Sequence, residues 1–100
     1  MTINKKTDNG NIVFILNGRL DTTTAPKLQE TLIPALEENV KQVILDFNGL
    51  AYVSSAGLRV LLMGQKTATK NNISMIIKNV PDEIMDVFNM TGFADMLEII

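Results

Sequence analysis

The 100-residue sequence contains no cysteine and no histidine. Without cysteine the chain has no disulfide, no thiol nucleophile and no thiolate metal ligand, which is typical of proteins from a reducing compartment. Without histidine it lacks the commonest general base and the commonest zinc ligand, so a serine–histidine–aspartate triad is excluded. Because so few catalytic or metal-binding groups remain, we expect no cofactor, no metal site and no obligate small-molecule ligand.

An excess of one charge and a long apolar run are also missing. The net charge is −2 and both signs are mixed along the chain, so no basic patch predicts binding to nucleic acid or to a membrane surface. The longest apolar run is far too short to span a bilayer, and no apolar segment follows the lysines of residues 1–8 as a signal peptide requires. We therefore expect a cytoplasmic protein with no nucleic-acid partner and no membrane insertion.

Hydrophobic residues make up 46% of the chain, enough to bury the core of one domain over residues 1–100. Asn9 and Gly10 predict a hairpin between strands at 2–8 and 12–16. Further strands are expected at 43–47, 73–77 and 98–100, with helices after the threonines at 22–24, over 55–69 and from 81 to about 91. This order predicts an α/β fold with a mixed, mostly parallel sheet, an N-terminal hairpin and helices packed against it.

Several local features carry more specific expectations. One of the threonines at 22–24 should cap the first helix, and Pro34 should kink that helix or break its hydrogen-bond ladder. The pair at 17–18 should end the second strand, and the Asn-Gly pair at 48–49 should form a turn with positive φ. The unalternating apolar run at 43–47 suits a strand covered on both faces.

The most informative segment runs from Asp46 to Leu62, a buried strand followed by a helix that opens on Ser54 and Ser55. A hydroxyl at a helix start lies beside unpaired N–H groups and the positive end of the helix dipole, where a phosphate is favourable. Helix capping is the other common use of serine at such a position. Both uses fit if Ser54 caps the helix while Ser55 presents its hydroxyl, and a one-residue shift would exchange them.

Three segments, at 18–21 (Gly-Arg-Leu-Asp), 45–50 (Leu-Asp-Phe-Asn-Gly-Leu) and 53–58 (Val-Ser-Ser-Ala-Gly-Leu), resemble the STAS domain family, and within it the bacterial anti-sigma factor antagonists. The resemblance implies partner switching: the unphosphorylated protein binds an anti-sigma factor that is also a serine kinase, which releases a sigma factor. Phosphorylation of one serine reverses binding, and a serine phosphatase resets the cycle. The matching acceptor is Ser55, with Ser54 the less favoured one. The chain departs from the family at Ser54, where many members have aspartate, and at Ala56, where many have a second hydroxyl.

The same resemblance implies a surface that binds the kinase. Its expected residues are Asp21, Thr22, Asn48, Ser54, Gly57 and Arg59. Four of them have a structural alternative: Asp21 as a helix-entry acid, Asn48 as a turn residue, Gly57 as a site of close packing, and Arg59 as a solvated charge. In its functional role, Arg59 would bind an acidic partner or the new phosphate.

Two other functions remain as alternatives to this regulatory, non-enzymatic reading. Some proteins that resemble this one are constitutive interaction subunits of transport or lipid-trafficking complexes, without a phosphorylation cycle. A phosphoryl-accepting aspartate with Mg²⁺ would need Asp21 or Asp46, but the paired acids and the later lysine of such domains are missing. We expect Asp46 instead to tie down a loop by accepting backbone N–H groups.

Overall fold

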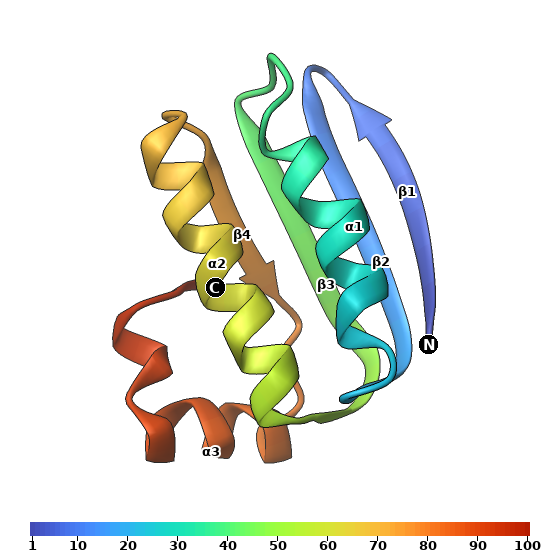
Figure 1. Cartoon of the computed structure of the whole chain (residues 1–100), viewed down its shortest axis with the longest axis vertical. Coiled ribbons are helices and arrows are strands. Elements are labelled where there is room, and N and C mark those ends of the chain that lie inside the picture. The colour runs from blue at the N-terminus through green and yellow to red at the C-terminus, as the bar shows by residue number, and fades with distance from the viewer.

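A computed structural model describes all residues 1–100 and confirms the α/β fold (Figure 1). The elements are β1 (Thr2–Asp8), β2 (Asn11–Leu20), α1 (Ala25–Ala35), β3 (Gln42–Val53), α2 (Ser55–Lys70), β4 (Ser74–Lys78), α3 (Asp82–Thr91), a 3₁₀ turn η1 (Phe93–Asp95) and β5 (Glu98–Ile99). The five strands form one sheet in the order β1-β2-β3-β4-β5. Only β1 and β2 pair antiparallel, through a hairpin in which Asn9 and Gly10 both have positive φ.

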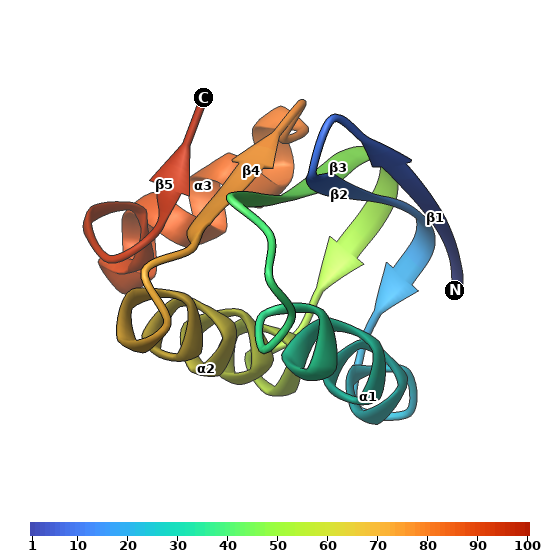
Figure 2. The same ribbon diagram turned by 90° about the horizontal axis from the view of Figure 1, so that it is seen from above.

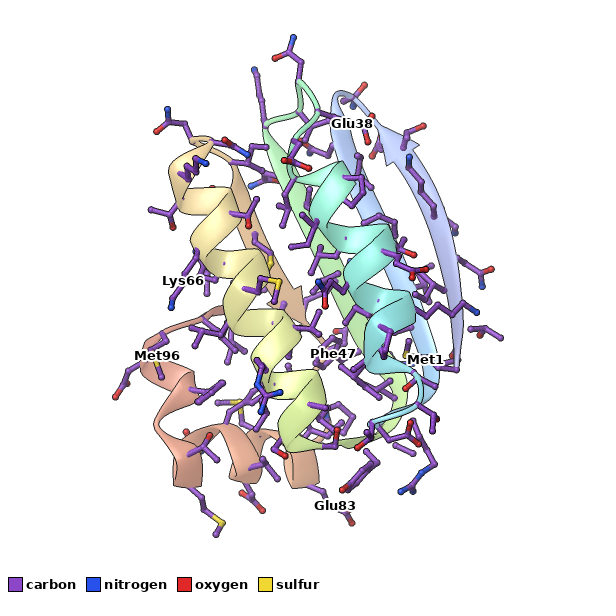
Figure 3. All side chains as sticks on the ribbon, in the orientation of Figure 1. Met1, Glu38, Phe47, Lys66, Glu83 and Met96 are labelled. Atoms are coloured by element: carbon purple, nitrogen blue, oxygen red, sulfur yellow. The ribbon has the colours of Figure 1, made fainter.

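Helices α1 and α2 lie side by side on one face of the sheet (Figures 1 and 2). The core fills the space between these two helices and the sheet. In Figure 3, Phe47 is seen behind the gap between the two helices. Helix α3 crosses the end of the sheet, where Phe88 packs on Phe47 with ring centroids 6.4 Å apart. None of the helices is long and apolar enough to cross a membrane.

The expectation that β3 is covered on both faces is wrong. Burial alternates along the strands, so that Leu45 is fully buried on the helical face while Ile44 on the opposite face is only half-buried. Val13, Ile15 and Ile76 share that second face and are also half-buried. These strands are more apolar than a solvent-facing sheet requires, which is why the run looked like a strand buried on both sides.

The expected breaks at residues 17–18 and 48–49 are also wrong, since both strands continue past them. The pairing of β2 with β3 shifts register between Ile15 and Asn17 and again between Gly18 and Arg19, so β-bulges absorb the turn-forming residues. Only Gly18 has positive φ there, +102°. The extra length brings Leu20 opposite Val53, immediately before the two serines.

Two expectations about α1 need correction in detail. Thr24 occupies the N-cap position, but its hydroxyl donates to the carbonyl oxygen of Arg19 at 2.8 Å and accepts no hydrogen bond from the helix. Pro34 does not kink the middle of the helix: it lies in the last turn, so the one ladder hydrogen bond that its missing N–H removes falls in that turn, and the helix ends one residue later. The end of α3 at Gly92 in the left-handed conformation is as expected.

Candidate functional site

The two serines at the start of α2 have different structural roles. Ser54 is the N-cap: its backbone is extended, and its Oγ accepts the N–H of Gly57 at 3.2 Å. Its own N–H donates to the carbonyl oxygen of Leu20 at 2.8 Å, which fixes the helix start to the end of β2. Ser55 is the first helical residue; it is exposed and its hydroxyl makes no hydrogen bond within the chain.

The first turn of α2 leaves room for an anion beside Ser55. The backbone N–H groups of Ser55 and Ala56 donate no hydrogen bond within the chain. They lie at the positive end of a 16-residue helix, and the unpaired N–H groups concentrate that partial charge. A free hydroxyl in this setting is chemically suited to accept a phosphoryl group and to keep it as a dianion.

Gly57 lets the start of α2 approach β2. A Cβ atom built on this glycine would lie 2.6 Å from Cγ of Leu20 and 3.2 Å from its carbonyl oxygen, so any side chain there collides with the strand. Gly57 itself is buried. It therefore acts on the serine site through the helix position that this close packing allows, as the packing alternative from the sequence proposes.

Asp21 organises the loop that enters α1. Its Oδ1 accepts hydrogen bonds from the hydroxyl of Thr23 at 2.8 Å and from the N–H groups of Thr23 and Thr24 at 3.0 and 3.1 Å. Its Oδ2 lies 3.9 Å from Nε of Arg19. Asp21 is thus the helix-entry acid that the structural alternative describes, and its second carboxylate oxygen lies on the side of Arg19.

The hydrogen bond from the Thr23 hydroxyl, opposed by partial desolvation and supported by the N–H groups of Thr24 and Thr23, holds the pKa of Asp21 below its ordinary value of 3.8. The folded state therefore binds this proton less tightly than the unfolded state, so the carboxylate stabilises the fold above pH 3.8 and loses that contribution as pH falls through the folded pKa.

We expect Asp21→Asn to be less stable than wild type at neutral pH, and the difference to shrink as pH drops below about 4. Urea unfolding at a series of pH values measures it; a difference that is constant with pH would contradict this assignment.

A small groove separates the starts of α1 and α2, next to Ser55. It has a volume of about 160 Å³, and its lining includes Thr22, Ala25, Pro26, Ala56, Arg59 and Met63. Arg59 follows Ser55 by one helical turn, is exposed and forms no ion pair. Thr22 and Arg59, chosen separately from the sequence, thus border the same groove.

Asp46 and Asn48 belong to a different part of the surface. Oδ1 of Asp46 accepts the backbone N–H of Asn48 at 3.0 Å and the side-chain amide of Asn79 at 3.1 Å, which ties the bulge of β3 to the loop after β4. This confirms the loop-fixing role expected for Asp46. Asp21 and Asp46 hold separate partners, and no three histidine, cysteine, aspartate or glutamate side chains gather where a metal ion could bind.

Sequence reasoning missed a stacked pair at the ends of β2 and β3. The guanidinium carbon of Arg19 lies 4.3 Å from the ring centroid of Tyr52. The two residues face each other in the strand register, but only because both strands continue past their bulges. The strands predicted from the sequence end at residues 16 and 47, which places Arg19 and Tyr52 outside the sheet, so their contact is not predicted.

The fold and the site define a small α/β domain whose distinctive surface chemistry is a free serine hydroxyl at a helix start. The chain belongs to the STAS domain family, whose sequence model matches residues 2–100. It is 27% identical over 84 residues to the anti-sigma-B factor antagonist of Staphylococcus aureus (strain NCTC 8325 / PS 47), an alignment that covers 84% of this chain and 78% of that protein.

The fold is similar to that of two solved structures. One is the anti-sigma factor antagonist SpoIIAA in its unphosphorylated form, with a TM-score of 0.83, 18% identity, and coverage of 99% of this chain and 88% of that one. The other is the Bacillus cell fate determinant SpoIIAA in its phosphorylated form, with a TM-score of 0.76, 18% identity, and coverage of 99% of this chain and 91% of that one. At these identities the likeness establishes a shared fold.

Proposed function

We propose that this chain is an anti-sigma factor antagonist that acts by partner switching. Its unphosphorylated form binds an anti-sigma factor serine kinase and so releases a sigma factor; phosphorylation of Ser55 ends that binding, and a serine phosphatase restores it. The proposal rests on the different roles of the two serines at the start of α2. Ser54 caps the helix, whereas the Ser55 hydroxyl is exposed and makes no hydrogen bond within the chain. The name of the Staphylococcus relative and the two forms of SpoIIAA support it.

The proposed partner surface extends from the Ser55 hydroxyl across the adjoining groove. Thr22 and Arg59 border that groove, and Asp21 heads the loop that carries Thr22. Ser54 and Gly57 contribute by fixing the helix start, through the cap and through the contact with Leu20. Asn48 is exposed beside Asp46, so its contact with the kinase requires a partner that also covers the bulge of β3.

A phosphate on Ser55 changes this surface in two ways. It adds about −1.5 to −2 charges at neutral pH, and burying such a charge in an interface carries a large desolvation penalty. It also lies one turn before Arg59, at the i, i+4 spacing that brings side chains together on a helix face. The guanidinium is then drawn to the phosphate and away from an acidic partner. A loss of about 3 kcal/mol lowers affinity by more than a hundredfold.

In this proposal the chain is a substrate and a binding protein, and it performs no catalysis. The Ser55 oxygen attacks the γ-phosphorus of ATP bound to the kinase, ADP leaves, and the hydroxyl proton passes to a base of the kinase. The proposed partners act in the cytoplasm, and we propose the same location for this chain. The alternative of a constitutive interaction subunit needs no accessible serine, so the free hydroxyl of Ser55 favours the switch.

Site mapping tests the proposal. We expect incubation with the cognate kinase and ATP to place one phosphate on Ser55, as measured by mass spectrometry of the digested protein. Ser54→Ala is the matched control: losing the cap hydrogen bond should cost about 1 kcal/mol of stability, yet Ser55 should still be modified. Ser55→Ala should take up no phosphate. Phosphate on Ser54 alone, or none on the wild type, would overturn the assignment.

A further inference from the structure

We propose that the stacked pair of Arg19 and Tyr52 is a second contact site for the kinase partner, where Arg19 binds a carboxylate of that partner and Tyr52 packs against the apolar part of the same segment. This inference rests on the proposed function. It adds a partner chemistry and two specificity-determining residues that lie outside the Ser55 groove.

Both side chains of the Arg19–Tyr52 pair are exposed to solvent. The Arg19 side chain is 62% exposed and Tyr52 is 41% exposed. Tyr52 is the single tyrosine of the chain, and the four phenylalanines are buried or half-buried, so Tyr52 is the one exposed aromatic ring. Exposed tyrosine and arginine are the residue types that, together with tryptophan, most often dominate the binding energy of protein interfaces.

The guanidinium of Arg19 is already held in a defined orientation. It stacks over the Tyr52 ring at 4.3 Å, and its Nε lies 3.9 Å from Oδ2 of Asp21. The backbone is fixed as well, because the carbonyl oxygen of Arg19 accepts the hydroxyl of Thr24 at 2.8 Å. A partner therefore finds this side chain partly ordered, and less conformational entropy is lost when the complex forms.

The free donors of Arg19 define what it can bind. Its two terminal nitrogens make no hydrogen bond within the chain, and the only ion pair of the side chain is through Nε. Two parallel N–H donors on a planar guanidinium match the two oxygens of a carboxylate, which is why arginine and not lysine recognises such groups bidentately. The guanidinium lies over the Tyr52 ring, and the exposed part of that ring is available to an apolar side chain of the partner.

The pair is adjacent along both strands to the residues that fix the start of α2. Arg19 and Tyr52 face each other on β2 and β3, one residue before the Leu20–Val53 pair. The carbonyl of Leu20 in turn accepts the N–H of Ser54. Asp21 adds a negative charge beside the positive charge of Arg19, and such alternating charges fix how a partner is aligned more than they add affinity.

Affinity measurements on matched variants test the proposal. The probe is the purified anti-sigma factor serine kinase from the same organism, titrated by calorimetry, with thermal melting as the control for folding. We expect Arg19→Ala and Tyr52→Ala each to weaken binding by about tenfold or more. Tyr52→Phe keeps the ring and should stay within about threefold of wild type, while Arg19→Lys keeps the charge but loses the fork and should fall between.

Lys66→Ala is the matched control for net charge, because Lys66 is an exposed lysine without an ion pair on the outer side of α2 (Figure 3). It should bind as wild type does. Binding of wild type should also weaken more steeply with added salt than binding of Arg19→Ala.

The outcomes separate this inference from the proposed function. If wild type binds the kinase and is phosphorylated on Ser55, but Arg19→Ala and Tyr52→Ala bind within twofold of it, the second contact is overturned and the switch stands. If wild type does not bind the kinase at all, both are overturned. If an alanine variant melts at a much lower temperature than wild type, the Arg19→Lys variant, which stays folded, is the deciding test. If Arg19→Lys binds the kinase as tightly as wild type does, bidentate binding of a carboxylate is rejected.

Discussion

Ser55→Asp is expected to weaken the complex with the anti-sigma factor kinase, while Ser55→Ala is expected to leave it intact. Aspartate brings one negative charge to the exposed start of α2, fewer than a phosphate, so the loss should be partial, about tenfold to a hundredfold. Alanine removes the acceptor oxygen, and because Ser54 rather than Ser55 caps the helix, it removes no capping hydrogen bond. Calorimetric titration of the three proteins with the kinase measures the difference.

The folding control for this experiment has its own expected result. A negative charge at a helix N-terminus is favourable, so Ser55→Asp should melt at or slightly above the wild-type temperature by circular dichroism. Ser55→Asn is the matched uncharged variant and should bind more tightly than Ser55→Asp. Equal affinity for folded Ser55→Asp and wild type would mean that charge at this position is not the switch.

Gly57→Val is expected to destabilise the fold strongly. Any Cβ at this position meets Cγ of Leu20 at 2.6 Å and the Leu20 carbonyl oxygen at 3.2 Å, and that carbonyl also accepts the N–H of Ser54. Overpacking against a strand costs about 3 kcal/mol. For a domain of this size that lowers the melting temperature by roughly 12–24 °C. Thermal unfolding followed by circular dichroism measures the shift.

A double-mutant cycle distinguishes this collision from a general effect of valine. Leu20→Ala alone should cost about 2–5 kcal/mol, because Leu20 is fully buried. Combined with Gly57→Val, it opens space for the new side chain, so the double variant should be more stable than the sum of the two losses predicts. Additive losses would show that Gly57 is not held by its contact with Leu20.

The element order was predictable because its signals are local. Asn9 and Gly10 specify a hairpin within a few residues, so the short polar segment at 2–8 is expected as a strand. The apolar run at 73–77 predicts β4, which the structure places at Ser74–Lys78. Helix α2 is marked by its serines at one end and by asparagines at the other. Each of these signals acts within one element, so no knowledge of the sheet is needed to read it.

The errors arise where local and long-range preferences conflict. The pair at 17–18 and the pair at 48–49 are turn formers in isolation, but in the sheet β2 and β3 pair across them with bulges. The register between two strands far apart in sequence decides this outcome, and a single local pattern does not contain it. For the same reason the pairing of Arg19 with Tyr52 was not foreseen.

For the candidate site, the sequence singled out the two serines but not the structural role of each. The sequence pointed to Ser54 and Ser55 and left open which one caps the helix; the hydrogen bond from Gly57 to Ser54 decides it. Asp21 was expected to be an exposed acid that contacts the kinase. Its bonds to Thr23 and Thr24 give it a structural task as well, which depends on the loop conformation and not on residue type.

The central claim is that a phosphate on Ser55 switches the partner, and the most direct measurement compares the two forms of the protein. The chain is phosphorylated by the kinase, its single modified residue is verified by mass spectrometry, and both forms are titrated with the same kinase by calorimetry. The account predicts that the phosphorylated form binds at least about a hundredfold more weakly, and that phosphatase treatment restores the original affinity. Equal affinities for a fully phosphorylated and an unphosphorylated protein would contradict the account and favour a constitutive interaction subunit.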